Sequence, residues 1–559
     1  MKKRNIFAVS SMLALAVMGS GMLSSCTDDF EDLNTNKTQV DPGDLPFAAQ
    51  CAEAMNYCYP PHQNMFQFWT NLTIDLYGGY FQTPHGNFTN CDMGENRGHS
   101  GGMYENYYLH IFNNTRRNIA NLDKQENAGL AGTMRIVQAV GTMQATDAYG
   151  PLAYSSIINA ESESTYRFDS QQKLYEQMLD DLDKAIAGLQ KMDDTEKASL
   201  ATYDTWGGGD PAIWVQIANT MKLRIALRLS KRESEMAADG YDLKAIATAA
   251  AANTLAVSGK DIVVKDQSNE LKRMFEWLDC GMNANLVTLM VGMNDPRLPL
   301  YMTKNADEIK NEKGEVTPKN SVYCGIRYAS GMAQKGSDGW YGYKMSQWVG
   351  SYNTPLPIFK AAEAYFLLAE AKLRWNIGAE SVKSLYEKGI RLSIKNELAY
   401  KGSFAGIENI SDADIDAYIN GTTGQADYVD PGNSANNCKA VNTLGVKWDD
   451  AASKEDQLAR IQTQKYIALF PLSNEGWAEQ RRTGYPKFFV ALVNKSNGAV
   501  DTQEGVRRVI YSSNAYDTNA EGVKGGIELL DKENTSKKGI SGDKGGTHLW
   551  WDNANKGNF

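Results

Sequence analysis

Two segments of the chain gather aromatic rings among amides and carboxylates. The first covers residues 66–81 and the second covers residues 340–348, with Asp338 and Gln347 close to the second group. Sugars present flat C–H faces that stack on aromatic rings, and hydroxyl rims that amides and carboxylates bind. With one further ring between these segments, the candidates for a ligand-binding platform are Trp340, Tyr341, Trp277, Trp69 and Tyr80.

Burial in the core is the alternative for each of these rings, because Trp and Tyr side chains usually lose most of their exposed surface on folding. Trp340 and Tyr341 stand in a glycine-rich stretch, which favours an exposed loop. Trp69 stands among alternating apolar residues, which favours burial. The pattern leaves both interpretations open for any single ring.

Catalysis has little support in the sequence. Glycoside hydrolysis needs two positioned carboxylates, and the 67 Asp and Glu residues are too many for one pair to be singled out. We expect no nucleophile elbow, phosphate-binding loop, HExxH motif or cysteine–histidine signature, and the five histidines are dispersed. We therefore expect a binding protein that is not an enzyme and that needs no cofactor.

Metal binding has equally little support. The cysteines that follow Cys26 have no CxxC spacing. Cys51 and Cys58 would lie on adjacent helical turns and could pair, although buried free thiols are the alternative. Residues 517–528 fit the spacing of a calcium loop, but Lys524 stands where an apolar residue normally enters the core. We predict no metal site.

Helices must position these groups, because apolar residues recur at three- and four-residue steps through much of the chain. The stripes come in pairs, near residues 103–149, 169–231, 357–399 and 455–483. In the third range one stripe runs from Ile358 to Leu373, with Gly378 as a helix stop, and a second follows from Val382. Such pairs resemble tetratricopeptide units, and an irregular helical domain without true repeats is the alternative.

Long stretches rich in Gly, Asn and Tyr separate the helical pairs, roughly at residues 62–102, 257–355 and 400–450. Loops of this length are uncommon unless they are functional. The sequence therefore predicts an all-α dominated fold, in which paired helices form a scaffold and the loop-rich insertions form the working surface.

The N-terminus has the pattern of a secretory signal. Lys2, Lys3 and Arg4 precede an apolar run that ends near Leu23, too short for a confident membrane span, although a transmembrane anchor is the alternative. The run ends in Leu23-Ser24-Ser25-Cys26, which resembles the lipobox of bacterial lipoproteins. That resemblance implies a signal peptide at residues 1–25, cleavage before Cys26 and lipidation of its sulfur.

Two or more acyl chains on Cys26 would anchor the protein stably. The acidic residues 27–32 that follow predict a solvated tether, and they resemble surface-export signals of lipoproteins. We expect a lipid-anchored protein on the outer face of the outer membrane, with a periplasm-facing anchor as the alternative. The net charge of −10 disfavours nucleic acid as a partner.

Several motifs occur in the order found in one known family. The chain resembles the SusD/RagB nutrient-binding lipoproteins over nearly all of residues 26–559, which we take as one domain. The matching motifs are Thr146-Asp147-Ala148-Tyr149-Gly150-Pro151, Trp214 with Lys222-Leu223-Arg224, Asn294-Asp295-Pro296-Arg297, Glu370-Ala371, Gln464-Lys465-Tyr466-Ile467, Glu479-Gln480-Arg481-Arg482-Thr483-Gly484-Tyr485-Pro486 and Arg507-Arg508-Val509-Ile510-Tyr511. Asp32-Leu33-Asn34-Thr35-Asn36 also resembles this family, but Lys37 follows it where Pro is common. Ser512 likewise stands where Pro often follows the last motif.

The resemblance implies a SusD-like fold, glycan binding on an aromatic surface, and a partner, a SusC-like TonB-dependent outer-membrane transporter that receives the ligand. The rings vary between members of the family, so no binding residue is carried over by motif. Capture of peptides or other nutrients is the alternative function, and a glycoside-active enzyme is a weaker one. The sequence does not name the glycan.

Overall fold

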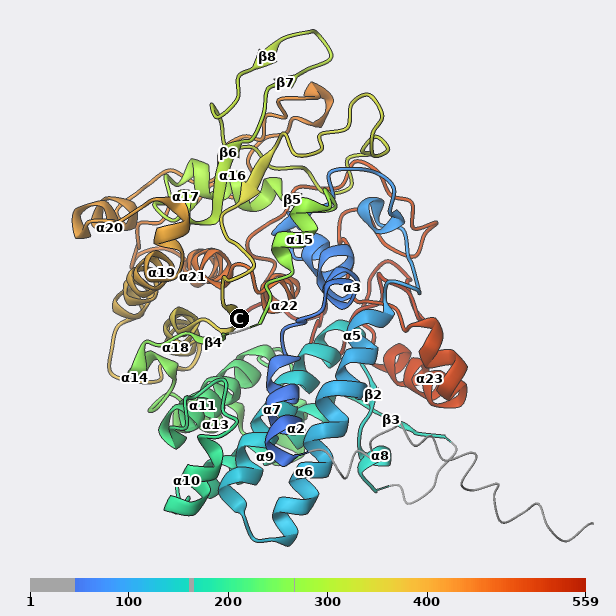
Figure 1. Ribbon diagram of the computed structural model, residues 1–559, viewed down its shortest axis with the longest axis vertical. Coiled ribbons are helices and arrows are strands. Elements are labelled where there is room, and N and C mark those ends of the chain that lie inside the picture. The colour runs from blue at the N-terminus through green and yellow to red at the C-terminus, as the bar shows by residue number, and fades with distance from the viewer. Residues whose placement is uncertain (1–45, 160–164, 266) are drawn as a thin grey trace, which may run out of the picture. The chain divides into compact units, whose positions relative to one another are not determined.

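Helices dominate the computed structural model, which describes residues 46–159, 165–265 and 267–559 (Figure 1). Residues 50–559 form one compact unit, and residues 46–49 belong to a separate N-terminal unit. The signal peptide, Cys26 and the acidic tether lie outside the described residues. Within those residues no helix is long and apolar enough to cross a membrane.

The helical segments are given by their bounds. They are α2 Phe47–Asn56, α3 Gln63–Phe66, η2 Gln67–Ile74, α4 Asp75–Tyr77, η3 Thr89–Asp92, α5 Gly101–Asn106, η4 Tyr107–Phe112, α6 Asn113–Lys124, α7 Ala128–Tyr149, α8 Ser155–Asn159, α9 Gln171–Leu189, α10 Asp194–Leu200, α11 Pro211–Arg228, α12 Glu233–Ala238, α13 Leu243–Ala250, α14 Leu255–Ser258, α15 Leu271–Glu276, α16 Ala284–Gly292, α17 Leu298–Tyr301, α18 Ala361–Trp375, α19 Val382–Ala405, α20 Asp412–Ile419, η5 Ser434–Asn436, α21 Lys454–Leu469, α22 Ser473–Thr483 and α23 Ser513–Glu533.

Short strands, most of them distant from their partners in the sequence, pair in two-stranded antiparallel sheets. The pairs are β1 Phe81–Gln82 with β5 Gly281–Met282, β2 Leu152–Ala153 with β3 Phe168–Asp169, β4 Ile262–Val264 with β10 Leu356–Phe359, β6 Met302–Asn305 with β9 Ser346–Trp348, and β7 Ile309–Lys310 with β8 Val316–Thr317.

Each of the four predicted ranges contains a pair of long helices, and consecutive pairs pack against one another. Helix α7 packs on α6 and α9, and α18 packs on α19 and α21. Small residues let α7 and α9 approach closely, since a Cβ on Gly188 would lie 2.3 Å from the carbonyl oxygen of Ala128. Nearly every residue of α7 is buried, as expected for a helix that is covered on more than one side.

The structure corrects several local predictions. Ile358 belongs to strand β10, and α18 begins at Ala361. That helix ends at Trp375, where Asn376 rather than Gly378 takes the left-handed conformation at its end. Residues 517–528, for which no calcium site is predicted despite the calcium-loop spacing, lie within helix α23, which has a kink at Asn519.

The cysteines of the described region are free thiols, including the two whose pairing was open, Cys51 and Cys58. Both side chains are buried. Burial raises the pKa of both thiols, so they are protonated and unreactive at neutral pH.

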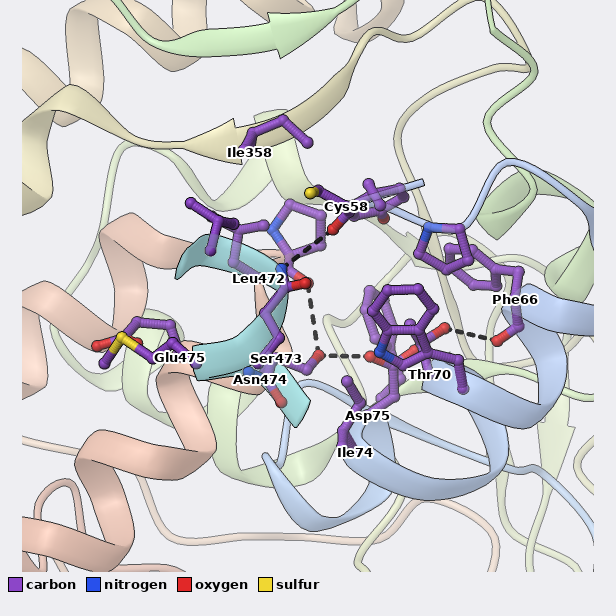
Figure 2. A pocket seen from close by; sticks show the side chains of 18 of the residues that line it. Cys58, Phe66, Thr70, Ile74, Asp75, Ile358, Leu472, Ser473, Asn474 and Glu475 are labelled. Atoms are coloured by element: carbon purple, nitrogen blue, oxygen red, sulfur yellow. Dashed lines mark hydrogen bonds between the residues drawn. The ribbon is translucent and has the colours of Figure 1, made fainter. Parts of the chain in front are cut away.

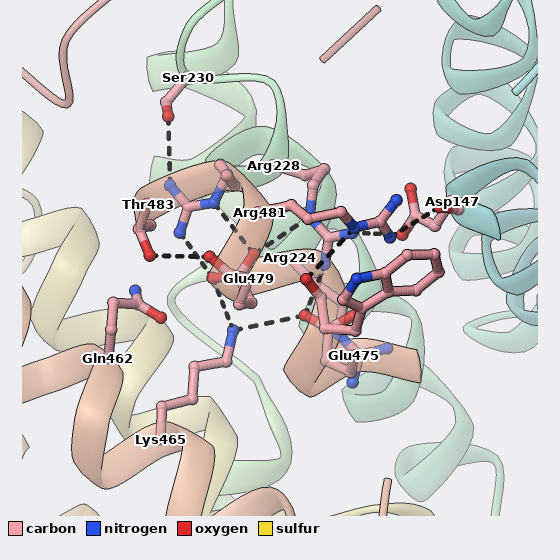
Figure 3. A network of polar contacts seen from close by, with 12 residues as sticks. Asp147, Arg224, Arg228, Ser230, Gln462, Lys465, Glu475, Glu479, Arg481 and Thr483 are labelled. Carbon is pink, nitrogen blue, oxygen red and sulfur yellow. Dashed lines mark hydrogen bonds and ion pairs between the residues drawn. The ribbon is translucent and has the colours of Figure 1, made fainter. Parts of the chain in front are cut away.

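A network of buried ion pairs joins the helices at the centre of the scaffold (Figure 3). Arg228 of α11, which is fully buried, pairs with Asp147 of α7 and with two carboxylates of α22. Its guanidinium lies 2.7 Å from Glu475 and 3.1 Å from Glu479. One side chain thus connects three helices that are far apart in the sequence.

The same network extends to α18 and α21. Arg482 of α22 lies 2.7 Å from Glu370 of α18 and 2.6 Å from Glu479. Lys465 of α21 lies 3.2 Å from Glu479 and 3.3 Å from Glu363 of α18. Burial raises the pKa of the Glu479 carboxyl, but the facing cations outweigh burial and hold that pKa well below its ordinary value. Glu479 is therefore ionised at neutral pH.

Most of the motifs that carry the resemblance meet in this network. Asp147, Arg224, Glu370, Lys465 and Glu479 come from five separate motifs, and all five side chains are buried. Cations in a last helical turn, such as Arg481 and Arg482, commonly complement the helix dipole from an exposed position. Gly484 does end α22 in the left-handed conformation, but Arg481 and Arg482 are buried, and Arg482 pairs with carboxylates instead of facing solvent.

Replacing one buried partner should destabilise the scaffold strongly. We expect Glu370→Gln to lower the free energy of unfolding by about 3–5 kcal/mol, because Arg482 and Arg374 would lose a buried counter-charge. Chemical denaturation of the soluble protein measures the change. Glu380→Gln, which breaks an exposed pair with Lys388, is the matched control and should have little effect. Equal losses in the two variants would contradict this role for the network.

Candidate aromatic binding surface

A π-helix places the aromatic residues of the first insertion. Helix η2 continues α3 and carries Gln67, Phe68 and Trp69. Phe68 is half-buried, whereas Trp69 is 3% exposed. Helix α5 packs directly on this backbone, since a Cβ on Gly102 would lie 2.7 Å from the Phe68 carbonyl carbon. Segments of π-helix are frequent at functional sites, and here the segment sends consecutive side chains to the surface and into the core.

Three half-buried rings from two segments lie against one another at this surface. Phe68 stacks on His99 with ring centroids 5.2 Å apart, and the edge of Phe88 meets His99 at 5.6 Å. Burial lowers the pKa of His99, so its imidazole is neutral at neutral pH. The cluster therefore has no positive charge that would repel cations or require an anionic ligand.

A buried carboxylate connects these rings to the second insertion. Asp279 accepts hydrogen bonds from His85 and Gln67, both at 2.9 Å, and from Lys335 at 3.0 Å. The ring of His85 in turn lies 5.3 Å from that of Phe88. Burial raises the pKa of Asp279, but the bonds from His85 and Lys335 outweigh burial and lower it. Asp279 is therefore ionised, and its hydrogen bonds join the two insertions.

The glycine-rich loop around Lys335 completes the surface beside Trp277. Lys335 donates a hydrogen bond to the carbonyl oxygen of Trp277, at the end of α15. The backbones of the two insertions also meet, since a Cβ on Gly86 would lie 2.2 Å from the carbonyl oxygen of Met332. The aromatic strip, as we call this surface, consists of Phe68, Phe88, His99 and Trp277, with the polar groups Gln67, Asn87 and Lys335.

The predicted platform residues fall into two groups. Trp277 and Trp340 are half-buried, and Trp340 lies on the same loop as Lys335. Trp69, Tyr80 and Tyr341 are 3%, 0% and 6% exposed, so in this conformation their rings have no face open to a glycan at the outer surface.

Hydrogen bonding explains the burial of the two tyrosines. The Tyr80 hydroxyl donates to the carbonyl oxygen of Tyr466, and the Tyr341 hydroxyl donates to Asp430 at 2.6 Å. Both phenols therefore satisfy their polar atom inside the protein, which removes the main cost of burying them. Tyr341 holds the base of the loop in a small core with Met345 and Ile326.

The sequence predicted the segment that contains Phe68, but it did not single out this half-buried ring as a surface residue. Phe88 and His99 were not predicted. An ordinary helical period predicts neither the π-helix nor the resulting side-chain directions. The only available signal for Phe88 was its position in the first insertion, next to Asn87 and Asn90.

Contrary to the expectation from the sequence, residues 98–102 read Gly-His-Ser-Gly-Gly and match the spacing of a nucleophile elbow. Such an elbow needs a strand before the serine, and residues 93–97 form no strand. The Ser100 hydroxyl donates to the carbonyl oxygen of Arg97 at 2.9 Å. His99 instead faces Asn90 at 3.0 Å. The pattern therefore forms a turn into α5 and not a nucleophile site.

The arrangement is suited to holding a flat polar ligand. The rings offer stacking faces, and exposed Asn87 and Lys335 offer donors and an acceptor at their rim. Within the described ranges no group of three or more His, Cys, Asp or Glu side chains could hold a metal ion. The strip thus provides contacts for binding.

Loss of the Asp279 tie should loosen the glycine-rich loop. We expect Asp279→Ala to accelerate amide hydrogen exchange in residues 330–343 and 84–88, because three side chains that join these segments lose their acceptor. Hydrogen–deuterium exchange with mass spectrometry measures the change. Asp338→Ala removes an exposed carboxylate from the same loop and serves as the control. Unchanged exchange in the Asp279 variant would show that the loop is held in another way.

Comparisons with known proteins place this geometry in context. The family model for SusD-like proteins, described as SusD and RagB outer membrane lipoprotein, matches residues 31–552. No curated protein matches the chain.

Solved structures are similar over nearly the whole chain. A chitin-binding SusD homologue from Flavobacterium johnsoniae is 29% identical, with a TM-score of 0.78 over 92% of this chain and 100% of its own. A SusD homologue from Bacteroides thetaiotaomicron is 26% identical, with a TM-score of 0.76 over 91% of this chain and 99% of its own. A third, from Bacteroides vulgatus, is 27% identical, with a TM-score of 0.76 over 92% of this chain and 98% of its own.

Proposed function

The chain belongs to the SusD and RagB family of outer membrane lipoproteins, and on that basis we propose that it captures a glycan on the aromatic strip and passes it to a transporter in the same membrane. The strip is the observation that carries the proposal. There half-buried Phe68 and Phe88 pack on His99, and Lys335 bonds the backbone carbonyl of half-buried Trp277.

Two further observations favour a glycan over a charged polymer. A similar structure, 29% identical over almost the whole chain, is described as chitin-binding, and that description concerns the relative. The strip itself has aromatic faces, a neutral imidazole and amides at its rim, and its Lys335 ammonium is paired with the Asp279 carboxylate, which also accepts from Gln67 and His85. A neutral sugar needs stacking faces and hydrogen-bonding groups, and it needs no counter-charge.

Membrane attachment and the transporter partner complete the proposed function. Lipidated Cys26 would anchor the protein, with the acidic residues 27–32 as a tether, and the glycan-binding unit would face the cell exterior. A SusC-like TonB-dependent transporter would receive the bound glycan. Both elements rest on membership of the family and on the lipobox-like sequence, which lies outside the described residues.

Removing a stacking ring of the strip should weaken glycan binding. We expect Trp277→Ala and Phe68→Ala each to reduce affinity for the preferred polysaccharide about 2- to 12-fold, which corresponds to about 0.5–1.5 kcal/mol for one aromatic contact. Affinity electrophoresis of residues 27–559 against a polysaccharide panel measures the retardation. The same samples should release no new reducing ends, whose appearance would instead indicate an enzyme.

A matched control separates the strip from a general effect of losing a tryptophan. Trp375, at the end of α18, is also half-buried and donates to Glu233 of α12, so Trp375→Ala should leave retardation unchanged. Equal weakening in all three variants, or none in the strip variants, would contradict the proposed binding surface.

Lipidation and the partner can be tested in one preparation. We expect the tagged full-length protein to co-purify with a transporter-sized membrane protein after mild detergent extraction. Cys26→Ser should move the protein to the soluble fraction, because it removes the acylated sulfur. Recovery of the wild-type protein always alone, or membrane retention of the Cys26 variant, would contradict this part of the proposal.

A further inference from the structure

A small pocket lies between the π-helix η2 and the start of α22 (Figure 2). Its walls come from η2, from the start of α22 and from helix α7. The side chains that bear on its chemistry are Trp69, Asp75, Gln144, Arg224, Asn474 and Glu475. No step of the proposed glycan capture uses this pocket, so its role is a separate question.

The Asp75 carboxylate is buried in this pocket with one oxygen unpaired. Its side chain belongs to a residue that is 2% exposed. One carboxylate oxygen, Oδ1, accepts a hydrogen bond from the Ser473 hydroxyl at 2.5 Å. The other, Oδ2, has no hydrogen-bond partner among the described residues, since the hydroxyl of neighbouring Thr70 donates to the carbonyl oxygen of Phe66 at 2.8 Å. A buried anion with a free oxygen is costly unless a cation or a proton meets it.

Two more buried acceptors line the same pocket. Asn474 Oδ1 and Gln144 Oε1 have no hydrogen-bond partner in the described part of the chain. The amide nitrogen of Gln144 is directed elsewhere, since it donates to the carbonyl oxygen of Cys58 at 3.0 Å. The unpaired atoms are thus one anionic and two neutral oxygens, all of them acceptors, which together call for a donor or a cation.

None of the described residues supplies a positive charge to Asp75. Arg224, at the far wall, is bound to Glu363 at 3.0 Å and lies 3.8 Å from Glu475, so its charge is already matched. Tyr59, Cys58 and Cys280 are the other titratable groups nearby, and burial raises the pKa of all three, which keeps them neutral. The pocket therefore keeps the negative charge of Asp75 uncompensated.

We propose that this pocket binds a small monovalent cation, an alkali-metal ion or a primary ammonium group, held by Asp75, Asn474 and Gln144. A single carboxylate with neutral amide oxygens suits one positive charge, whereas protein sites for divalent cations usually collect more anionic oxygens. Trp69 lines the same space, and an indole ring attracts cations. The cavity has a volume of about 50 Å³, and one water-sized occupant needs roughly 10–15 Å³.

A bound cation would connect the two sides of the pocket. Asp75 directly follows η2, and Asn474 lies in the first turn of α22. The ion would therefore fasten the π-helix that carries Phe68 to the helix that carries Glu475 and Glu479 of the buried network. This inference goes beyond glycan capture and stands or falls independently of it.

Thermal unfolding at constant ionic strength tests the proposal. Melting temperatures are compared in choline chloride, potassium chloride, sodium chloride and methylammonium chloride at pH 8.5. We expect at least one of the three small cations to raise the melting temperature by about 1 °C at tenfold its dissociation constant, and by about 2.5 °C at a hundredfold. A response to methylammonium alone would identify an ammonium ligand, and a response to potassium or sodium would identify a metal ion.

Variants and pH locate the effect. Asp75→Asn should abolish the response while keeping an oxygen that accepts from Ser473, and Asp194→Asn, at a fully exposed side chain, should keep it. Burial raises the pKa of Asp75 to about 7, although the Ser473 bond acts in the opposite direction. Below that pKa the folded carboxyl is protonated and uncharged, so the response of the wild-type protein should also disappear at pH 5.

A measurement on the wild-type protein alone makes the test independent of how the variants fold. Crystals grown in rubidium chloride should show anomalous density within ligand distance of Asp75 Oδ2. An equal cation response in wild type and Asp75→Asn would overturn the proposal. So would the absence of any cation response. If potassium or sodium raises the melting temperature, a pocket occupied only by water, without anomalous density, would overturn it as well.

Discussion

The buried ion network constrains the rest of the structure. Arg228 and Arg482 are fully buried, and their carboxylate partners come from α7, α18 and α22. A buried charge without a partner costs several kcal/mol, so these helices must assemble together in the arrangement that brings every charge to its counter-charge. Hydrophobic burial alone would allow the helices to slide, because apolar contacts have no direction. The network instead selects one register.

The insertions inherit their geometry from this scaffold. Glu475 and Glu479 fix α22, which packs against the π-helix η2. Helix η2 then carries Phe68 to the aromatic strip and Trp69 to the pocket. Asp279 adds the second constraint, because its bonds to Gln67, His85 and Lys335 join the two insertions that form the strip. Rigid helices therefore support a surface made mostly of loops, which is a common way to combine order with binding specificity.

The helix pairs could be predicted from sequence because their apolar stripes are long and regular. The four predicted ranges contain α6 with α7, α9 with α11, α18 with α19, and α21 with α22. Boundaries were less certain where two signals compete, as at Ile358, whose apolar side chain suits both a helix and strand β10. The buried network was not predictable, because Arg481-Arg482 near a helix end equally suits a solvated turn.

The site was predictable only to the level of the segment. A run such as 66–71 places aromatic rings in the first insertion, but the π-helix decides that Phe68 faces outward and Trp69 inward. Tyr80 and Tyr341 are buried because each hydroxyl donates a hydrogen bond to a distant acceptor. The acceptor is a carbonyl oxygen 386 residues away for Tyr80 and a carboxylate 89 residues away for Tyr341. Such long-range partners leave no local pattern in the sequence.

The central claim is that the aromatic strip holds the glycan. A crystal structure of residues 27–559 with an oligosaccharide of the class that the protein retains would test it most directly. We expect sugar rings stacked on Phe68 and Trp277, with their hydroxyls hydrogen-bonded to Asn87 or Lys335. Sugar density at another surface, with the strip unoccupied, would contradict it.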